Sequence, residues 1–178
     1  MTKKRAIFLD RDGVINKKAK EHDYIKNWGE FEFLPHVRDV ISQLNKKFLV
    51  VVVSNQGGIS RGLVTLDDVN SIHAKMQSEL EKSNAIIDKI YVCPHYTKEK
   101  CACRKPEPGL ILQAQKELNI DLSNSYMIGD SLIDIEAGKK AGCKTIFLGK
   151  LKDYSRIHKK LMPDFVADNI LEITHFIG

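Results

Sequence analysis

The chain has 178 residues, of which 43% are hydrophobic and 29% are charged, and its formal net charge is +5. This length and composition predict one globular domain that can bury a full core. The positive charge comes from scattered lysines without a basic helix, which indicates a Lys-rich surface and no nucleic-acid partner. The N-terminus lacks the apolar core of a signal peptide, and no later stretch is apolar enough for a membrane span. We therefore expect a cytoplasmic monomer with no membrane partner.

The first apolar run, residues 7–9, leads directly into Asp10, Arg11 and Asp12. A run without polar alternation is typical of a strand buried on both faces of a parallel sheet. Ligands bind just beyond the carboxyl ends of such strands. Gly13 lets the backbone turn, so both carboxylates can point into one crevice, where they need a cation or a shared proton. The alternative is that an Asp after a strand is only a turn residue.

Apolar strands and amphipathic helices alternate along the remaining chain. After a polar flap over residues 14–34, the pattern predicts strands at 48–53, 86–92, 126–128, 145–148 and 165–166. It predicts helices that begin at Pro35, after Thr65, at Pro108 and after Asp168, and a helix after Asp130 that contains the small residues Ala137, Gly138 and Ala141. His73 falls on the apolar face of its helix and is interpreted as a packed core residue. The alternation predicts an α/β fold of three layers with a parallel sheet in the middle.

Polar residues also follow two later strands. Ser54, Asn55 and Gln56 end the second strand, and Asp130 ends the fourth. Asp134 lies one helical turn beyond Asp130, and the sequence leaves open whether it supports the site or only begins a helix.

A second constellation lies in the loop at 93–106. Cys93, His95, Cys101 and Cys103 fall within eleven residues, as Cys-x-His and Cys-x-Cys pairs. These soft ligands suit a closed, structural zinc site with four protein ligands. The alternative is a set of reduced thiols in a loop, and Cys143, which stands apart, is expected to be an inert core thiol.

The order DRDG, SNQ, a lone Lys and GDSLID resembles the haloacid dehalogenase (HAD) superfamily of aspartyl phosphotransferases over nearly the whole chain. Residues 7–149 look like the heptose bisphosphate phosphatases and related histidinol-phosphatase domains, of the HAD-IIIA type. This narrower resemblance rests on DRDGVIN, FEFLP, SNQGGISRG and CPH…CACRKPEPG. It implies a Rossmann-like HAD domain over residues 1–178, with a minimal cap and a zinc loop.

The resemblance implies a role for each matching residue. Asp10 would attack phosphorus and become an aspartyl phosphate, while Asp12 would protonate the leaving oxygen and then deprotonate water. Ser54 and Lys105 would hold the phosphoryl oxygens, and Asp10, Asp130 and the Asp12 carbonyl would bind magnesium. General chemistry agrees, because a bare carboxylate is repelled by an anionic phosphate unless a hard cation such as Mg²⁺ is present.

Neither gap between the motifs can hold a cap domain, so an open crevice is expected. The residues expected to bind substrate are four in the flap and four around the crevice: Glu21, His22, Asp23, Tyr24, Asn55, Gln56, Arg104 and Ser131. Arg104 is expected to hold the distal phosphate of a bisphosphate, because its planar fork suits that group. The alternative is that Arg104 only covers the zinc loop or pairs with a surface acid.

These expectations describe a magnesium-dependent phosphatase of a small phosphorylated sugar. The first candidate substrate is the 7-phosphate of D-glycero-D-manno-heptose 1,7-bisphosphate, followed by histidinol phosphate and then another small sugar phosphate. One departure concerns Ser131, which stands where the heptose enzymes often carry a basic residue. A hypothesis of another class is a non-catalytic, zinc-stabilised binding module, and the intact set of Asp10, Asp12, Lys105 and Asp130 argues against it.

Overall fold

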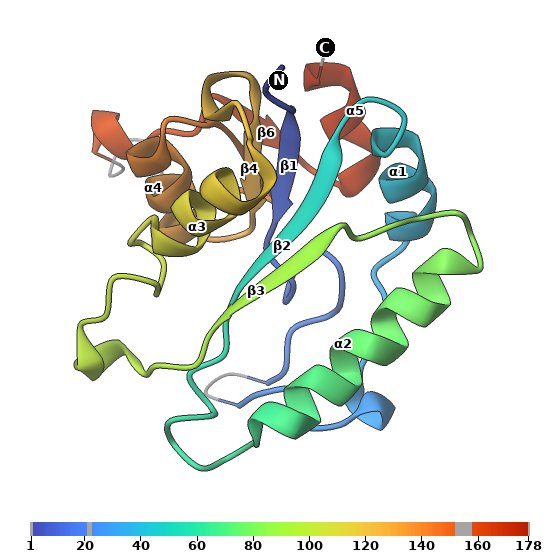
Figure 1. Cartoon of the computed structure of the whole chain (residues 1–178), viewed down its shortest axis with the longest axis vertical. Coiled ribbons are helices and arrows are strands. Elements are labelled where there is room, and N and C mark those ends of the chain that lie inside the picture. Colours follow the sequence, from blue (N-terminus) through green and yellow to red (C-terminus); the bar gives the residue numbers. More distant parts are fainter. Residues whose placement is uncertain (1, 21–22, 152–157, 178) are drawn as a thin grey trace.

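The computed structural model describes residues 2–20, 23–151 and 158–177. Its centre is a six-stranded, fully parallel sheet in the order β3-β2-β1-β4-β5-β6 (Figure 1). The strands are β1 (Ala6–Leu9), β2 (Leu49–Asn55), β3 (Lys89–Cys93), β4 (Tyr126–Gly129), β5 (Lys144–Leu148) and β6 (Phe165–Ala167). The predicted α/β architecture is confirmed, and β1, which carries the first motif, lies between β2 and β4.

Alternate residues of the central strands enter two separate hydrophobic clusters. On β1, Ile7 and Leu9 pack on one face while Ala6 and Phe8 pack on the other, and all four are fully buried. The helices α1 (Val37–Leu44), α2 (Leu66–Glu81) and α5 (Ile173–Phe176) contribute to the first cluster. The helices α3 (Gly109–Leu118) and α4 (Leu132–Ala141) contribute to the second. The sheet is therefore the middle of three layers, as its unbroken apolar strands predicted.

The helix ends follow local chemistry and differ in places from the sequence-based boundaries. At the start of α2, Thr65 Oγ1 accepts a hydrogen bond from the Asp68 amide, and the Asp68 carboxylate accepts one from the Thr65 amide. Helix α1 begins at Val37 and not at Pro35, because His36 adopts a left-handed conformation with φ of 63°.

Two further boundaries were predicted wrongly. Strand β3 begins at Lys89, three residues later than expected, and directly before it the side chain of Asp88 accepts a hydrogen bond from the Val50 amide. The last helical segment is capped by Asn169 and not by Asp168, because the Asn169 side chain accepts a hydrogen bond from the Leu171 amide. That segment starts as a 3-10 turn, Ile170–Glu172, and continues as α5.

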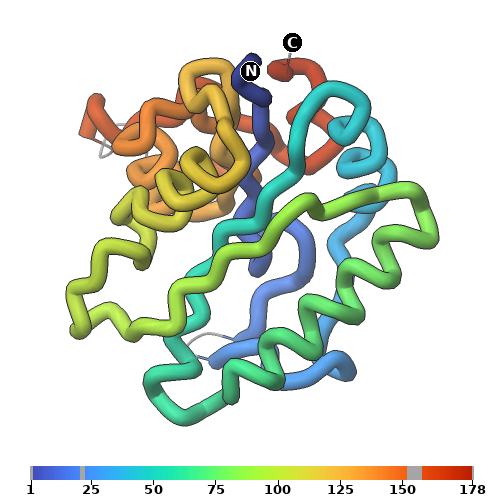
Figure 2. Tube along the Cα trace, in the orientation of Figure 1, coloured from blue at the N-terminus to red at the C-terminus, as the bar shows by residue number. Residues whose placement is uncertain are grey.

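The flap and the loop 93–106 follow the carboxyl ends of β1 and β3. The flap contains a 3-10 turn, Trp28–Glu30, and aromatic packing in which the Trp28 and Phe31 rings stack with centroids 4.8 Å apart. In Figure 2 the described chain begins and ends near one end of the molecule, while the loop after β2 lies at the opposite end. Among the described residues, no helix has the length and apolarity needed to cross a membrane.

Candidate active site

The carboxyl end of β1 brings Asp10 against a buried lysine. Lys105 follows the Cys/His loop, and its ammonium nitrogen lies 2.9 Å from Asp10 Oδ1 and 2.7 Å from Asp134 Oδ1. The same nitrogen donates a hydrogen bond to the Val53 carbonyl at 2.7 Å. Because the Lys105 side chain is only 2% exposed, its charge needs these partners.

The pKa directions follow from this arrangement. Burial raises the pKa of Asp10 to about 6, and the nearby Asp134 and Asp12 charges add to the rise while Lys105 opposes it. Burial acts to lower the pKa of Lys105, but Asp10 and Asp134 outweigh burial and raise it. At neutral pH the structure therefore holds an ionised Asp10 next to a permanently charged lysine.

Asp134 supports the site as well as beginning a helix. It lies in the first turn of α4, is 1% exposed, and pairs with Lys105. A Cβ at position 129 would lie 2.2 Å from the Asp134 Cβ, so only Gly129 lets α4 bring Asp134 this close to β4. The question that the sequence left open is answered by the Lys105 ion pair.

The carboxylate of Asp12 is held by donors from three side chains. Arg11 Nη2 contacts both of its oxygens at 3.0 and 2.9 Å. Asn16 Nδ2 donates at 2.9 Å and Gln56 Nε2 at 2.8 Å. Burial acts to raise the pKa of Asp12, but the Arg11 charge and these hydrogen bonds outweigh it and lower the pKa.

The three polar residues at the end of β2 lie at the site in different ways. Ser54 is fully buried and its hydroxyl accepts a hydrogen bond from Gln56 Nε2 at 2.9 Å. Asn55 Oδ1 accepts from the Lys105 amide and Asn55 Nδ2 donates to the Lys105 carbonyl, both at 3.0 Å. Gln56, which is 1% exposed, orients Asp12. Direct contact of Asn55 and Gln56 with substrate stays a prediction.

Asp10, Asp130 and Asp134 form an acidic cluster whose ligand oxygens lie within 4.8 Å of one another. Asp130 Oδ1 is buried without a hydrogen-bond partner among the described residues, as expected of an oxygen that ligates a cation. The ammonium of Lys18, from the flap, lies 2.7 Å from Asp130 Oδ2. A Cβ at position 13 would lie 1.9 Å from that same oxygen, so Gly13, with φ of +96°, is needed for this approach. These hard oxygens fit magnesium.

Two adjoining cavities open onto these residues. One, of about 220 Å³, is lined by Asp10, Asp12, Lys18, Asn55, Arg104, Lys105, Asp130, Ser131, Ile133 and Asp134. The other, of about 270 Å³, shares Asp12, Lys18 and Asn55 and adds the flap residues Lys20, Asp23 and Tyr24. A larger hollow of about 730 Å³ between the flap and α1 contains none of the residues from the strand ends. The predicted substrate-binding residues Glu21 and His22 lie outside the described residues.

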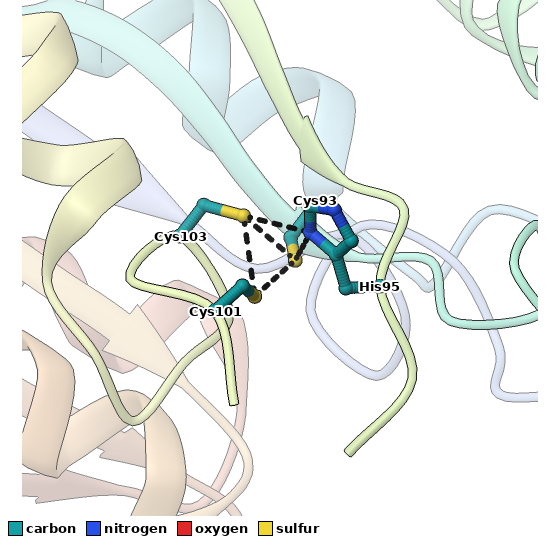
Figure 3. A group of neighbouring side chains, drawn as sticks. All are labelled: Cys93, His95, Cys101 and Cys103. Atoms are coloured by element: carbon teal, nitrogen blue, oxygen red, sulfur yellow. Dashed lines mark hydrogen bonds between the residues drawn. The ribbon is translucent and has the colours of Figure 1, made fainter. Parts of the chain in front are cut away.

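Cys93, His95, Cys101 and Cys103 converge on one point (Figure 3). The sulfur atoms lie 3.1 to 3.5 Å apart, and His95 Nδ1 lies 3.2 Å from Cys103 and 3.6 Å from Cys93. A zinc tetrahedron with Zn–S bonds of about 2.3 Å has edges of about 3.8 Å, close to these separations. All four cysteines of the chain are free thiols. The geometry fits one tetrahedral metal ion.

Arg104 connects this cluster to the cavity. Its Nη1 donates a hydrogen bond to the His95 carbonyl at 2.9 Å, while its side chain lines the cavity with Asp10 and Lys105. Both interpretations of Arg104 therefore have support, because it contacts the Cys/His loop and also faces the crevice.

Four residues at the site were not singled out as site residues from the sequence: Arg11, Asn16, Lys18 and His73. An Arg between two carboxylates in DRDG was a signal for Arg11. His73 is 5% exposed, so its interpretation as a packed residue is confirmed, yet its Nε2 also lies 3.1 Å from Arg11 Nη1. That contact joins residues 62 positions apart, and no local pattern shows it.

Comparison with known proteins gives one consistent result. A HAD-hydrolase-like family model matches residues 102–173. The D-glycero-beta-D-manno-heptose-1,7-bisphosphate 7-phosphatase of Pasteurella multocida is 38% identical over 181 residues, which cover 98% of this chain and 97% of that protein. The D-glycero-alpha-D-manno-heptose-1,7-bisphosphate 7-phosphatase of Mycobacterium tuberculosis is 38% identical over 150 residues, covering 80% and 78%.

A solved structure has the same fold. The D,D-heptose 1,7-bisphosphate phosphatase from B. bronchiseptica, crystallised with magnesium and phosphate, has a TM-score of 0.84 and 30% identity, with 97% of each chain covered. The part of this chain that is covered includes the first motif, the Cys/His loop and the last strands. The chain belongs to the heptose bisphosphate phosphatase family of the HAD superfamily.

Proposed function

We propose that the protein is a magnesium-dependent phosphatase that removes the 7-phosphate of D-glycero-D-manno-heptose 1,7-bisphosphate through a phosphorylated Asp10. The observation that carries this proposal is that Asp10 contacts the Lys105 ammonium and also belongs to the acidic cluster with Asp130 and Asp134. A carboxylate with a cation on each side can approach an anionic phosphate that would otherwise repel it. The choice of a heptose 1,7-bisphosphate as substrate rests on the relatives, which are named as heptose 1,7-bisphosphate phosphatases.

Asp10, Asp130 and the Asp12 carbonyl would hold magnesium, with the Asp134 carboxylate close by. When bound, the ion supplies positive charge that neutralises the phosphate and orients it. Asp10 then attacks phosphorus in line with the leaving oxygen, and Lys105 with the Ser54 hydroxyl stabilises the charge on the equatorial oxygens.

Asp12 moves the protons in both halves of the reaction. In the substrate-free structure its pKa is lowered, chiefly because Arg11 and two amide donors outweigh burial. A phosphate anion placed beside Asp12 opposes that effect, since a neighbouring negative charge raises the pKa of a carboxyl group. Asp12 can thus carry a proton to the leaving sugar oxygen and then take one from the water that attacks the phosphorylated Asp10.

We further propose a structural zinc ion bound by Cys93, His95, Cys101 and Cys103. Four protein ligands leave no open position for substrate, so the ion would fix the loop without taking part in the reaction. Lys105 and Arg104 follow directly after Cys103, so the ordered loop determines where both cations lie.

The cavity favours a bisphosphate over histidinol phosphate. Arg104 and Lys18 both line it, so positive charge is present even though Ser131 replaces the basic residue expected there. A second phosphate can pair with this charge, whereas the cationic amine of histidinol phosphate is repelled by it. Histidinol phosphate stays the second candidate because of Ser131.

A cytoplasmic location and a monomeric state also belong to this proposal. The free thiols support a reducing, cytoplasmic location. We expect the protein to act as a single-domain monomer, and light scattering at working concentrations tests this expectation.

The test is a panel of phosphorylated metabolites with magnesium, including both heptose bisphosphate anomers and histidinol phosphate. The highest kcat/KM on a heptose bisphosphate is the expected result. A preference for histidinol phosphate would replace the substrate, and no hydrolysis of any ester would favour a binding module.

A further inference from the structure

Arg11 is an unusually buried charge at the catalytic edge of the sheet. Its side chain is 0% exposed and is among the largest fully buried side chains of the described residues. A buried guanidinium is costly unless its N–H groups are paired. Two of its nitrogens, Nε and Nη2, contact the carboxylate of the next residue, Asp12, at 2.9 to 3.3 Å.

The third nitrogen reaches a different element of the fold. Arg11 Nη1 lies 3.1 Å from Nε2 of His73, on the buried face of α2. Arginine has only donors, so His73 Nε2 must be the acceptor and the imidazole must be neutral, with its proton on Nδ1. Burial, and then the Arg11 charge, lower the pKa of His73 to about 4, in agreement with this neutral form.

We propose that His73 is a positioning residue for the reaction: it anchors Arg11, and Arg11 in turn fixes the plane of the Asp12 carboxylate. The inference rests on the proposed function, in which Asp12 is the acid and base. His73 is not part of the acidic cluster of Asp10, Asp130 and Asp134, and it lines neither of the two adjoining cavities at the site. Its effect must therefore pass through Arg11.

The other two side-chain donors to Asp12 each reach only one of its carboxylate oxygens. Asn16 Nδ2 and Gln56 Nε2 each make one hydrogen bond to the carboxylate, and each also contacts a second acceptor. Arg11 contacts both oxygens through a planar fork, which sets the plane as well as the position. Without His73, the third nitrogen of Arg11, Nη1, would lose its acceptor inside the core, and Arg11 would turn to find another.

The reaction offers a readout that separates positioning from general damage. A sugar alkoxide needs a proton as it leaves, whereas p-nitrophenolate leaves as a stable anion. The ratio kcat/KM covers the steps up to departure of the leaving group. Misplacing Asp12 therefore harms a sugar phosphate far more than p-nitrophenyl phosphate, while a disordered site harms both.

Three variants test the contact in the full-length enzyme with magnesium. For His73→Leu we expect kcat/KM on heptose 1,7-bisphosphate to fall roughly 10- to 100-fold, and on p-nitrophenyl phosphate about threefold or less. His73→Gln should restore most of the loss, because a Gln amide oxygen can reach the place of Nε2. His73→Asn should not, because its amide reaches only the place of Nδ1.

The outcomes are distinct. Equal losses on both esters, or equal activity of His73→Gln and His73→Asn, would overturn the positioning role while the proposed function stands. If His73→Leu fails to fold, as thermal unfolding would show, the contrast between the Gln and Asn variants decides. If the wild-type enzyme hydrolyses neither ester, the proposed function fails and the positioning role fails with it.

Discussion

The ammonium nitrogen of Lys105 lies 2.9 Å from a carboxylate oxygen of Asp10 at the carboxyl edge of the sheet, where Lys105 is buried and Asp10 is partly buried. The pair places the proposed nucleophile and the cation proposed to hold the transferred phosphoryl group side by side. The main chain of Lys105 is held on both sides by the amide of Asn55, so the pair depends on β2 as well as on the loop.

Replacement of the nucleophile tests the covalent scheme. Asp10→Asn keeps the size of the side chain but removes the attacking oxygen, so kcat should fall roughly a thousandfold or more. Circular dichroism should be unchanged, because the sheet and its two cores do not depend on this charge. Trapping of phosphate on a residue other than Asp10, detected by mass spectrometry, would contradict the scheme.

Magnesium binding should depend on pH through Asp10. Its pKa is raised to about 6, chiefly by burial, so in the metal-free protein Asp10 takes up a proton as the pH falls below that value. Because magnesium binds the ionised form, its affinity should be steady above pH 7 and fall by up to about tenfold per pH unit below 6. Calorimetric titration at several pH values measures this, with Asp10→Asn as the control that binds weakly throughout. A constant affinity between pH 5 and 7 would show that Asp10 is not a ligand.

The sequence predicted the strands and the motifs at their ends better than it predicted the contacts between those motifs. The unbroken apolar run before Asp10 and the βα alternation are local patterns, and both are confirmed in β1 and in the parallel sheet. The Arg11–His73 contact and the Lys18–Asp130 ion pair join distant segments, so no periodicity could show them. The start of the last helical segment was missed for a smaller reason, since two adjacent residues, Asp168 and Asn169, are both good N-caps.

Arg104 should distinguish a bisphosphate from a monophosphate. Arg104→Ala removes the fork that can bind a distal phosphate, so kcat/KM for a heptose bisphosphate should fall roughly 10- to 100-fold, or about 1.4 to 3 kcal/mol. A monophosphorylated sugar should lose much less. Arg104→Lys is the matched control, since it keeps the charge but not the paired donors.

The hydrogen bond from Arg104 to the His95 carbonyl supplies the competing explanation for that variant. If Arg104 only holds the Cys/His loop, both substrates should lose activity equally and the bound zinc should decrease. Steady-state kinetics on the two substrates, with zinc measured in the same preparations, separate the two roles.

The Cys/His cluster should hold about one zinc ion per chain, as measured by elemental analysis of the purified protein. Zinc binds only the deprotonated thiolate form of the cysteines, so zinc should leave as the pH is lowered. Cys101→Ser should weaken zinc binding and lower activity through Arg104 and Lys105, while the sheet stays folded. Cys143→Ser is the control, because Cys143 is buried and is not one of the four converging residues. Protein with full activity and no zinc would contradict this prediction.

Phosphorus NMR of D-glycero-D-manno-heptose 1,7-bisphosphate incubated with the enzyme and magnesium shows directly which phosphate the enzyme removes. The two phosphates give separate signals, so the spectrum reports which ester is cleaved. We expect the 7-phosphate signal to be replaced by inorganic phosphate while the 1-phosphate remains, and Asp10→Asn or excess chelator to prevent the change. Loss of the 1-phosphate, or equal hydrolysis in chelator, would contradict it.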